Sequence, residues 1–192
     1  YLPYHVEDVE NALQDTIDQY RINRQRGQDV YIELWTEKDA ISGILKRSTE
    51  KYHVQLVVNK GYTSSSAIYG AYKRVAHYIK KGKKVVILYF GDHDPSGLDM
   101  IRDIRDRLEL FLTSGESIAR GTDFYEETIQ PWWDKNNYTI YDLMDGGYTS
   151  TNLNKLLNEE NDEAIREFEI AQLKMFLAEH ELFKVLPIGL TM

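Results

Sequence analysis

The stretch Lys84-Val-Val-Ile-Leu-Tyr-Phe-Gly-Asp-His-Asp-Pro-Ser-Gly-Leu98 decides the fold of this chain. An unbroken apolar run from Val85 to Phe90 is typical of a strand buried on both faces, as in a parallel sheet. The run stops at Gly91, and the Asp-Pro that follows places Pro95 at the first position of a helix. We therefore predict a buried strand, a short acidic loop and a helix that runs to about Thr113.

Two further apolar runs precede this stretch, Val30–Trp35 and Val54–Val58. Helical periodicity resumes after each of them, and a Thr/Ser cluster can cap the second helix, which is expected to end near Lys81. Strands that alternate with helices indicate an α/β fold, with a mostly parallel sheet that helices cover on both faces. Phe183–Ile188 is predicted to be a last strand at an edge of the sheet, because Pro187 lacks a backbone donor.

The domain organisation predicted from these patterns has four parts. Residues 1–28 form an N-terminal amphipathic helix, and residues 29–112 form the α/β core. Residues 113–182 form an acidic, aromatic and mainly helical insertion, and residues 183–192 supply the last strand. Because the first residue is Tyr1 and not Met, we expect the chain to be a fragment. The apolar stripe of the first helix consists of Val6, Val9, Leu13, Ile17 and Tyr20.

Two details of the insertion are also predicted. Its clear helix spans residues 164–180, and a short helix is expected at 153–157. The aromatic group Trp132, Trp133, Tyr138 and Tyr141 is interpreted as a buried subcore in preference to a protein-binding surface.

The composition excludes several classes of protein. A chain of 192 residues suits one domain, or one domain with an appendage. It has no cysteine, which excludes disulfides, cysteine nucleophiles and thiolate metal sites. There is no apolar run of the roughly 20 residues that a membrane span needs and no signal-peptide pattern. We expect a cytoplasmic protein.

The net charge of −8 is unevenly distributed. Residues 1–108 hold 17 Lys and Arg against 15 Asp and Glu, a balance of +2, whereas residues 109–192 hold 6 against 16, a balance of −10. Residues 73–84 carry six basic residues and no acid. The first part is therefore compatible with a partner that bears phosphates, despite the acidic total.

Three acids follow two of the predicted strands. Glu37 comes after the first strand, and Asp92 and Asp94 come after the third. Because the carboxyl ends of parallel strands meet at one edge, these carboxylates can converge there if the first and third strands are neighbours. Three hard oxygen ligands suit Mg²⁺ or Mn²⁺, which would act on a phosphate, with Glu37 as a general acid or base. Lys38 and Lys60, also at strand ends, are the candidate phosphate-binding residues.

Each of these residues also has a structural interpretation. Asp94 is well placed to cap the helix that starts at Pro95. Glu37 can face a helix dipole in the first turn of its helix. His93 is expected to be a solvent or packing residue, and the two lysines can be ordinary exposed residues.

The same blocks carry a family resemblance. A strand followed by Glu37-Lys38, a strand followed by Lys60-Gly61-Tyr62, and a strand followed by the block 91–98 (GDHDPSGL) together resemble the Toprim domain of the topoisomerase VI A subunit and its meiotic double-strand-break relatives. The resemblance covers residues 29–112. It implies a compact Rossmann-like sheet, Mg²⁺ bound by Glu37, Asp92 and Asp94, and action on DNA in the cytoplasm or nucleoid.

The resemblance leaves the reaction open. The family cleaves DNA with a tyrosine on an upstream winged-helix domain, which the residues before Asp29 are too few to form. The nucleophile is therefore either a tyrosine outside this chain or a water molecule, as in a nuclease. DNA is expected to approach over Lys38, Lys60 and residues 73–84.

Other functions remain as alternatives. One is a non-catalytic Toprim-like module that binds DNA or a protein, and a protein partner or a homodimer is compatible with either reading. A metal-dependent glycosyltransferase also uses an Asp-x-Asp motif, but it does not account for Glu37 or Lys60.

Overall fold

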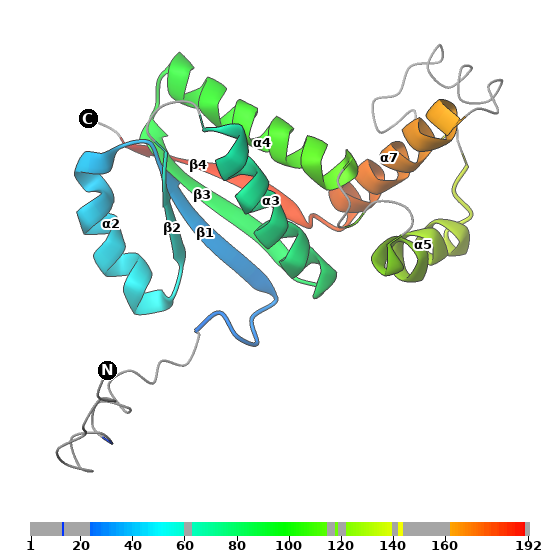
Figure 1. Ribbon diagram of the computed structural model, residues 1–192, viewed down its shortest axis with the longest axis horizontal. Helices are drawn as coiled ribbons and strands as arrows, with labels where there is room; N and C mark the ends of the chain where they lie inside the picture. The colour runs from blue at the N-terminus through cyan, green and yellow to red at the C-terminus, as the bar shows by residue number, and fades with distance from the viewer. Residues whose placement is uncertain are drawn as a thin grey trace, which may run out of the picture.

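The computed structural model describes residue 13 and residues 24–59, 63–114, 118, 122–139, 142–143 and 162–190. Its centre is a four-stranded sheet in which every neighbouring pair of strands is parallel, in the order β2-β1-β3-β4 (Figure 1). This confirms the predicted α/β fold with a parallel sheet. The strands are β1 (Val30–Thr36), β2 (Gln55–Val58), β3 (Lys84–Asp92) and β4 (Phe183–Leu190).

Helices connect the strands close to the predicted positions. The Ser64 hydroxyl accepts a hydrogen bond from the Ala67 backbone N–H at 3.3 Å, so the Thr/Ser cluster does cap its helix. Leu13 is helical, and the rest of the predicted helix before Arg24 and the predicted short helix at 153–157 lie outside the described residues. The helices are α2 (Asp39–Tyr52), α3 (Ser65–Lys80), α4 (Pro95–Ser114), the π-helix η1 (Tyr125–Ile129), α5 (Gln130–Lys135) and α7 (Asp162–Glu179).

The strand order determines which face of the sheet each helix covers. The step from β1 to β2 moves toward one edge, whereas the steps from β2 to β3 and from β3 to β4 move toward the other. Since such crossovers are right-handed, α2 lies on one face and α3 and α4 lie together on the opposite face. Figure 1 shows α3 and α4 side by side over the sheet, and they contact each other.

The main core lies between the sheet and the α3/α4 layer. Alternate residues of β1 and β3, among them Trp35, Ile87 and Tyr89, are buried there against α3, α4 and α7. The intervening residues Val86 and Leu88 are only half-buried. The predicted helices on both faces are confirmed. On the second face, the strands that α2 contacts substantially are β1 and β2. Just one crossover moves toward that edge, so a single helix is left to cover the second face.

The described part of the insertion forms a small core of its own. Trp133 is buried with Leu143 and Ala171, and Trp132 and Tyr138 pack against them. The predicted aromatic subcore is confirmed for these residues, while Tyr141 lies outside the described residues. No helix within the described ranges is long and apolar enough to cross a membrane.

Candidate active site at the carboxyl ends of β1 and β3

The predicted acids lie at one edge of the sheet. β1 and β3 are neighbours, with Thr36 opposite Phe90, so Glu37 follows the end of β1 where β3 continues to Asp92. Glu37 and Asp92 are half-buried, and Asp94 is exposed. The first and third strands are therefore adjacent, which is the condition for these acids to converge.

Lys38 places a cation among these acids. Its Nζ bonds directly to Oδ1 of Asp92, and the two side chains are about one third exposed, at 32% and 30%. The hydrogen bond to Asp92 raises the pKa of Lys38, and the negative charges of Asp92, Glu37 and Asp94 add to this effect against partial desolvation. All three carboxylates therefore act on one ammonium group. The backbone N–H of Lys38 donates to Thr36 Oγ1 at 3.1 Å, and this hydrogen bond fixes the turn after β1.

Asp94 has the structural role that its sequence position suggested. Its Oδ1 accepts a hydrogen bond from the Gly97 backbone N–H at 2.8 Å, which caps the start of α4. Gly97 itself lies against the preceding strand, because a Cβ at this position would stand 2.1 Å from the Asp92 carbonyl oxygen. Only glycine fits there. The loop that carries Asp92 and Asp94 therefore packs directly against the first turn of α4.

Glu37, Asp92 and Asp94 are the candidate ligands for a divalent cation. Within the described ranges, no group of three or more His, Asp and Glu side chains is arranged to hold a metal ion. Asp92 is bonded to Lys38, and one oxygen of Asp94 is bonded to Gly97. The carboxylate oxygens are nevertheless the ligands that Mg²⁺ prefers, and the Lys38 ammonium is a stand-in cation at Asp92. The donors are therefore of the chemical type that a divalent ion prefers, but the described residues do not arrange three of them to hold one.

Asn59 is a residue of this edge that sequence reasoning missed. It follows β2 and is 6% exposed, and its backbone N–H donates to the Thr36 carbonyl oxygen at 2.7 Å. Its side-chain Nδ2 is buried without a hydrogen-bond partner. A buried donor that is left unpaired suits an acceptor from outside the chain, such as a phosphate oxygen. Its position directly after an apolar strand was the signal available in the sequence. Lys60, the next residue, lies outside the described residues.

Tyr89 lies beneath the acidic edge and is almost fully buried. Burial, followed by the charge of Glu37, raises the pKa of Tyr89 to about 12. Its hydroxyl group donates to Met100 Sδ at 3.4 Å. Tyr89 is therefore a neutral packing residue at physiological pH, and the negative charge of Glu37 disfavours ionisation of its phenol.

An ion pair between a buried glutamate of β1 and a partly exposed arginine of α3 links the two elements. Glu33 is fully buried and accepts hydrogen bonds from Arg74 Nε at 2.7 Å and Nη2 at 3.0 Å. Tyr31 and Trp35 donate to the same carboxylate at 3.0 and 2.9 Å. Arg74 was counted among the basic residues available to DNA, and this pair removes it from that set. Its role is to neutralise a core glutamate.

The remaining basic cluster lies far from the acids. Lys84 begins β3 and Asp92 ends it, so eight residues of strand, about 26 Å, separate them. Lys83 donates to the Gln25 carbonyl oxygen at 2.9 Å, and Lys84 pairs with Glu181 at 3.6 Å. DNA that touched both Lys38 and this cluster would have to run the length of α3.

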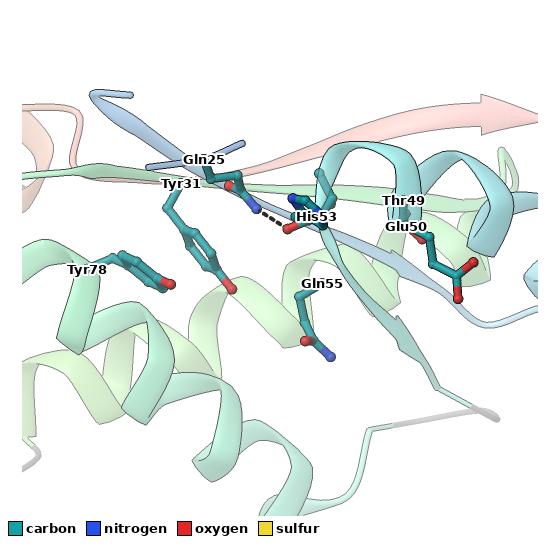
Figure 2. A pocket seen from close by; sticks show the side chains of 8 residues that line it. Gln25, Tyr31, Thr49, Glu50, His53, Gln55 and Tyr78 are labelled. Atoms are coloured by element: carbon teal, nitrogen blue, oxygen red, sulfur yellow. Dashed lines mark hydrogen bonds between the residues drawn. The ribbon is translucent and has the colours of Figure 1, made fainter. Parts of the chain in front are cut away.

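A cavity of about 540 Å³ opens at the amino ends of β1 and β2 (Figure 2). Tyr31 stacks on Tyr78 there with ring centroids 3.6 Å apart, and Gln25 Nε2 donates to the His53 carbonyl oxygen at 2.9 Å. The cavity is at the opposite end of β1 from Glu37 and does not belong to the acidic edge.

Comparisons with protein-family models, curated proteins and solved structures return no match for this chain.

Proposed function

We propose that this chain is a Toprim-like, Mg²⁺-dependent catalytic domain that acts on DNA phosphodiesters. The observation that supports the proposal best is the Lys38–Asp92 pair, in which a cation lies among Asp92, Glu37 and Asp94 at the carboxyl edge of a parallel sheet. Ligands of open α/β sheets bind at this edge. The family resemblance of the sequence blocks points to the same residues.

In this proposal Glu37, Asp92 and Asp94 hold Mg²⁺, for which Mn²⁺ can substitute. The ion, when bound, would polarise a phosphate oxygen and stabilise the charge that develops at the oxygen that attacks or leaves. Lys38, released from Asp92, binds a phosphate oxygen, and the unpaired Asn59 Nδ2 donates to another. Lys60 is assigned the same role from its sequence position.

Glu37 is the candidate proton carrier, because its half-buried carboxylate lies at the same edge as the metal ligands. The nucleophile is either a water molecule, which would make the domain a nuclease, or a tyrosine of another domain, which would make it a topoisomerase-type transesterase. The DNA substrate places the protein in the cytoplasm at the nucleoid, and a protein partner or a second copy is expected against the acidic insertion.

A non-catalytic Toprim-like module that binds DNA or a protein is the second candidate. It is favoured by the bonds that Asp92 and Asp94 already make within the chain, to Lys38 and to the start of α4. In that case both aspartates are structural, and the edge binds no metal.

Mn²⁺ binding by the full chain distinguishes the two. Electron paramagnetic resonance of free Mn²⁺ should show saturable binding to the wild type, and Asp92→Asn with Asp94→Asn should abolish it. Asp106→Asn, which alters an exposed pair with Arg105, is the control and should bind as the wild type does. Incubation with supercoiled plasmid and Mg²⁺ then reports cleavage, and a 5′-phosphate or a tyrosyl adduct identifies the nucleophile. Absence of Mn²⁺ binding in the wild type would rule out the catalytic proposal.

A further inference from the structure

A row of exposed side chains on α3 carries positive charge. Tyr69, Lys73, His77 and Lys81, the last of them the C-cap residue of the helix, are exposed and four positions apart. Residues at this spacing form a ridge that runs obliquely over the surface of a helix, and we call these four residues the α3 ridge. Residues 51–91, which include the ridge, hold eight Lys and Arg and no Asp or Glu. The α3 ridge therefore suits a polyanion.

The α3 ridge begins at an aromatic ring that is both exposed and held in place. Tyr69 is 44% exposed, and its ring packs against those of Tyr72 and Phe111 with centroids 5.6 and 5.8 Å apart. Lys73 Nζ lies 4.7 Å from the centre of the Tyr69 ring. Surfaces that bind single-stranded nucleic acid combine such rings, on which bases stack, with cations that contact the phosphates.

The neighbouring helix α4 does not cancel this charge. Its residues Asp99, Asp103 and Asp106 are each paired with an arginine of the same helix. Arg107, the partner of Asp103, also donates to the Thr63 carbonyl oxygen at 2.7 Å and so ties α4 to the loop before α3. These three acids are thus neutralised within α4, and the lysines of the α3 ridge keep their charge.

The cavity at the amino ends of β1 and β2 adjoins the other end of α3, where Tyr78 and Tyr31 line it as a stacked pair (Figure 2). Gln55 lies opposite Glu33 in the strand register, so its side chain is on the α3 face of the sheet. The described lining contains the Glu50 carboxylate and no Lys or Arg. A phosphate is therefore disfavoured in the cavity. A neutral base can lie against the tyrosine rings and form hydrogen bonds with the Gln55 amide.

The α3 ridge leads from Tyr69 toward this cavity. Tyr69 contacts Phe111 of α4, whereas Tyr78 contacts Tyr31 of β1, so the two rings lie on opposite sides of α3. They are nine residues apart, which corresponds to about 13.5 Å along the helix axis. A strand that contacts both must therefore cross α3 obliquely, as the ridge does.

We propose that single-stranded DNA binds across α3, with its phosphates on the lysines of the α3 ridge, one base stacked on Tyr69 and another in the cavity beside Tyr78. Lys83 Nζ, 6.0 Å from the centre of the Tyr78 ring, adds a cation at the cavity end. A duplex cannot bind in this way, because its bases are paired and stacked inside the helix. The choice of DNA rests on the proposed function, whereas the binding surface itself needs no metal.

Fluorescence anisotropy of labelled oligo(dT) with the full chain in EDTA tests the proposal. The wild type should bind the single strand roughly tenfold or more tightly than a duplex of the same length, because only unpaired bases can stack on the tyrosines. Equal affinity for the two would overturn the proposal, and tighter binding of oligo(U) would overturn the choice of DNA. EDTA removes any divalent ion, so a failure here leaves the Mn²⁺ test of the acidic edge unaffected, and the reverse is also true.

Tyr69→Ala should weaken the binding of oligo(dT) roughly five- to hundred-fold, and Tyr69→Phe should bind as the wild type does. Tyr52→Ala is the matched control, because Tyr52 is 51% exposed with Lys51 Nζ 5.5 Å from its ring but belongs to α2 on the opposite face of the sheet. Equal losses in Tyr69→Ala and Tyr52→Ala would overturn the stacking on α3.

The salt dependence separates the phosphate contacts from the base contacts. Lys73→Gln with Lys81→Gln should lower the slope of log affinity against log salt by roughly 1.4, since each phosphate contact of a single strand contributes roughly 0.7. Lys46→Gln with Lys51→Gln, on α2, should leave the slope unchanged. Gln55→Ala should weaken binding several-fold at an unchanged slope, because Gln55 contacts a base. The same slope in both lysine pairs would overturn the path across α3.

Discussion

Lys38 and Asp92 are 54 residues apart in the sequence and form a direct ion pair at the edge of the sheet. Lys38 belongs to the turn after β1, and Asp92 is the last residue of β3, so the pair joins two neighbouring strand ends. If a divalent ion binds at Asp92, it must compete with this ammonium group. The pair therefore sets the metal affinity of the proposed site.

Lys38→Ala is expected to tighten Mn²⁺ binding. An ion pair that solvent reaches is weak, so its removal should lower the dissociation constant only roughly two- to five-fold. Lys46→Ala removes the same charge from an exposed pair with Glu50 on α2 and should have little effect. Isothermal titration of Mn²⁺ measures both. Equal affinities for wild type and Lys38→Ala would refute competition at Asp92 while leaving the metal site intact.

Asn59→Ala should separate binding from stability. The Nδ2 group has no partner among the described residues, so its loss removes no hydrogen bond that the structure shows, and the free energy of unfolding should change by less than about 1 kcal/mol. DNA binding or cleavage should weaken if the group donates to a phosphate. Urea unfolding and a filter-binding assay give the two values. A large loss of stability would indicate a structural role for Asn59 instead.

Gly97→Ala should disturb the loop that carries the aspartates. A Cβ 2.1 Å from the Asp92 carbonyl oxygen forces the loop to move, which is expected to cost about 1–3 kcal/mol of unfolding free energy and to weaken Mn²⁺ binding. Gly43→Ala is the matched control, because a Cβ there meets nothing within 4 Å inside α2. That variant should gain up to about 1 kcal/mol from helix propensity. Urea unfolding of both variants checks the contrast, which a loss of equal size in the two would contradict.

Arg74→Ala should be among the most destabilising substitutions in the core. It leaves Glu33 buried without a counter-charge, which typically costs about 3–5 kcal/mol. Glu33→Gln combined with Arg74→Met removes both charges. The amide oxygen can still accept from Trp35 and the amide NH2 can donate to the Tyr31 hydroxyl, so the double variant should recover most of the loss. Arg105→Ala, in an exposed pair with Asp106, should change stability by about 0.5 kcal/mol or less. Chemical denaturation would contradict the assignment if the double variant were no more stable than Arg74→Ala.

Alkaline pH should destabilise the fold through Tyr89. The pKa of Tyr89 is raised from 10.0 to about 12, so the unfolded chain loses this proton at a lower pH than the folded protein does. Its contribution to stability is complete below pH 10 and is lost as the pH rises toward 12. Tyr31, whose pKa is also raised by burial and by Glu33, adds to the effect. Tyr89→Phe should flatten the fall in unfolding free energy between pH 9.5 and 11.5, measured with urea at each pH. An unchanged slope would mean that other groups control alkaline unfolding.

The sequence predicted the strands because their apolar runs are continuous, and it predicted the acidic edge because Glu37, Asp92 and Asp94 directly follow two of them. It could not predict the use of Arg74. That residue lies within a basic stretch on α3, and its partner Glu33 lies 41 positions away inside an apolar strand. A short-range pattern does not record such a pair, because only the packing of α3 on β1 brings the two together.

Short-range sequence patterns also do not predict which helix covers which face of the sheet. An apolar run such as Val85–Phe90 indicates burial on both faces but not what provides it. The direction of each crossover decides which face a helix covers, and that direction depends on the strand order β2-β1-β3-β4. Strand order is a property of the assembled sheet and leaves no local trace in the sequence.

The pairing of β3 with β4 also has a consequence for synthesis. Phe183, the first residue of β4, follows Asp92, the last residue of β3, by 91 positions. At about 5–20 residues per second, the ribosome needs roughly 5–18 seconds to make the intervening chain. During that interval β3, the most apolar strand, has one edge without a neighbour, and such edges recruit other chains. The nascent protein therefore passes through a defined period of aggregation risk, in which a chaperone that shields strand edges would raise its yield.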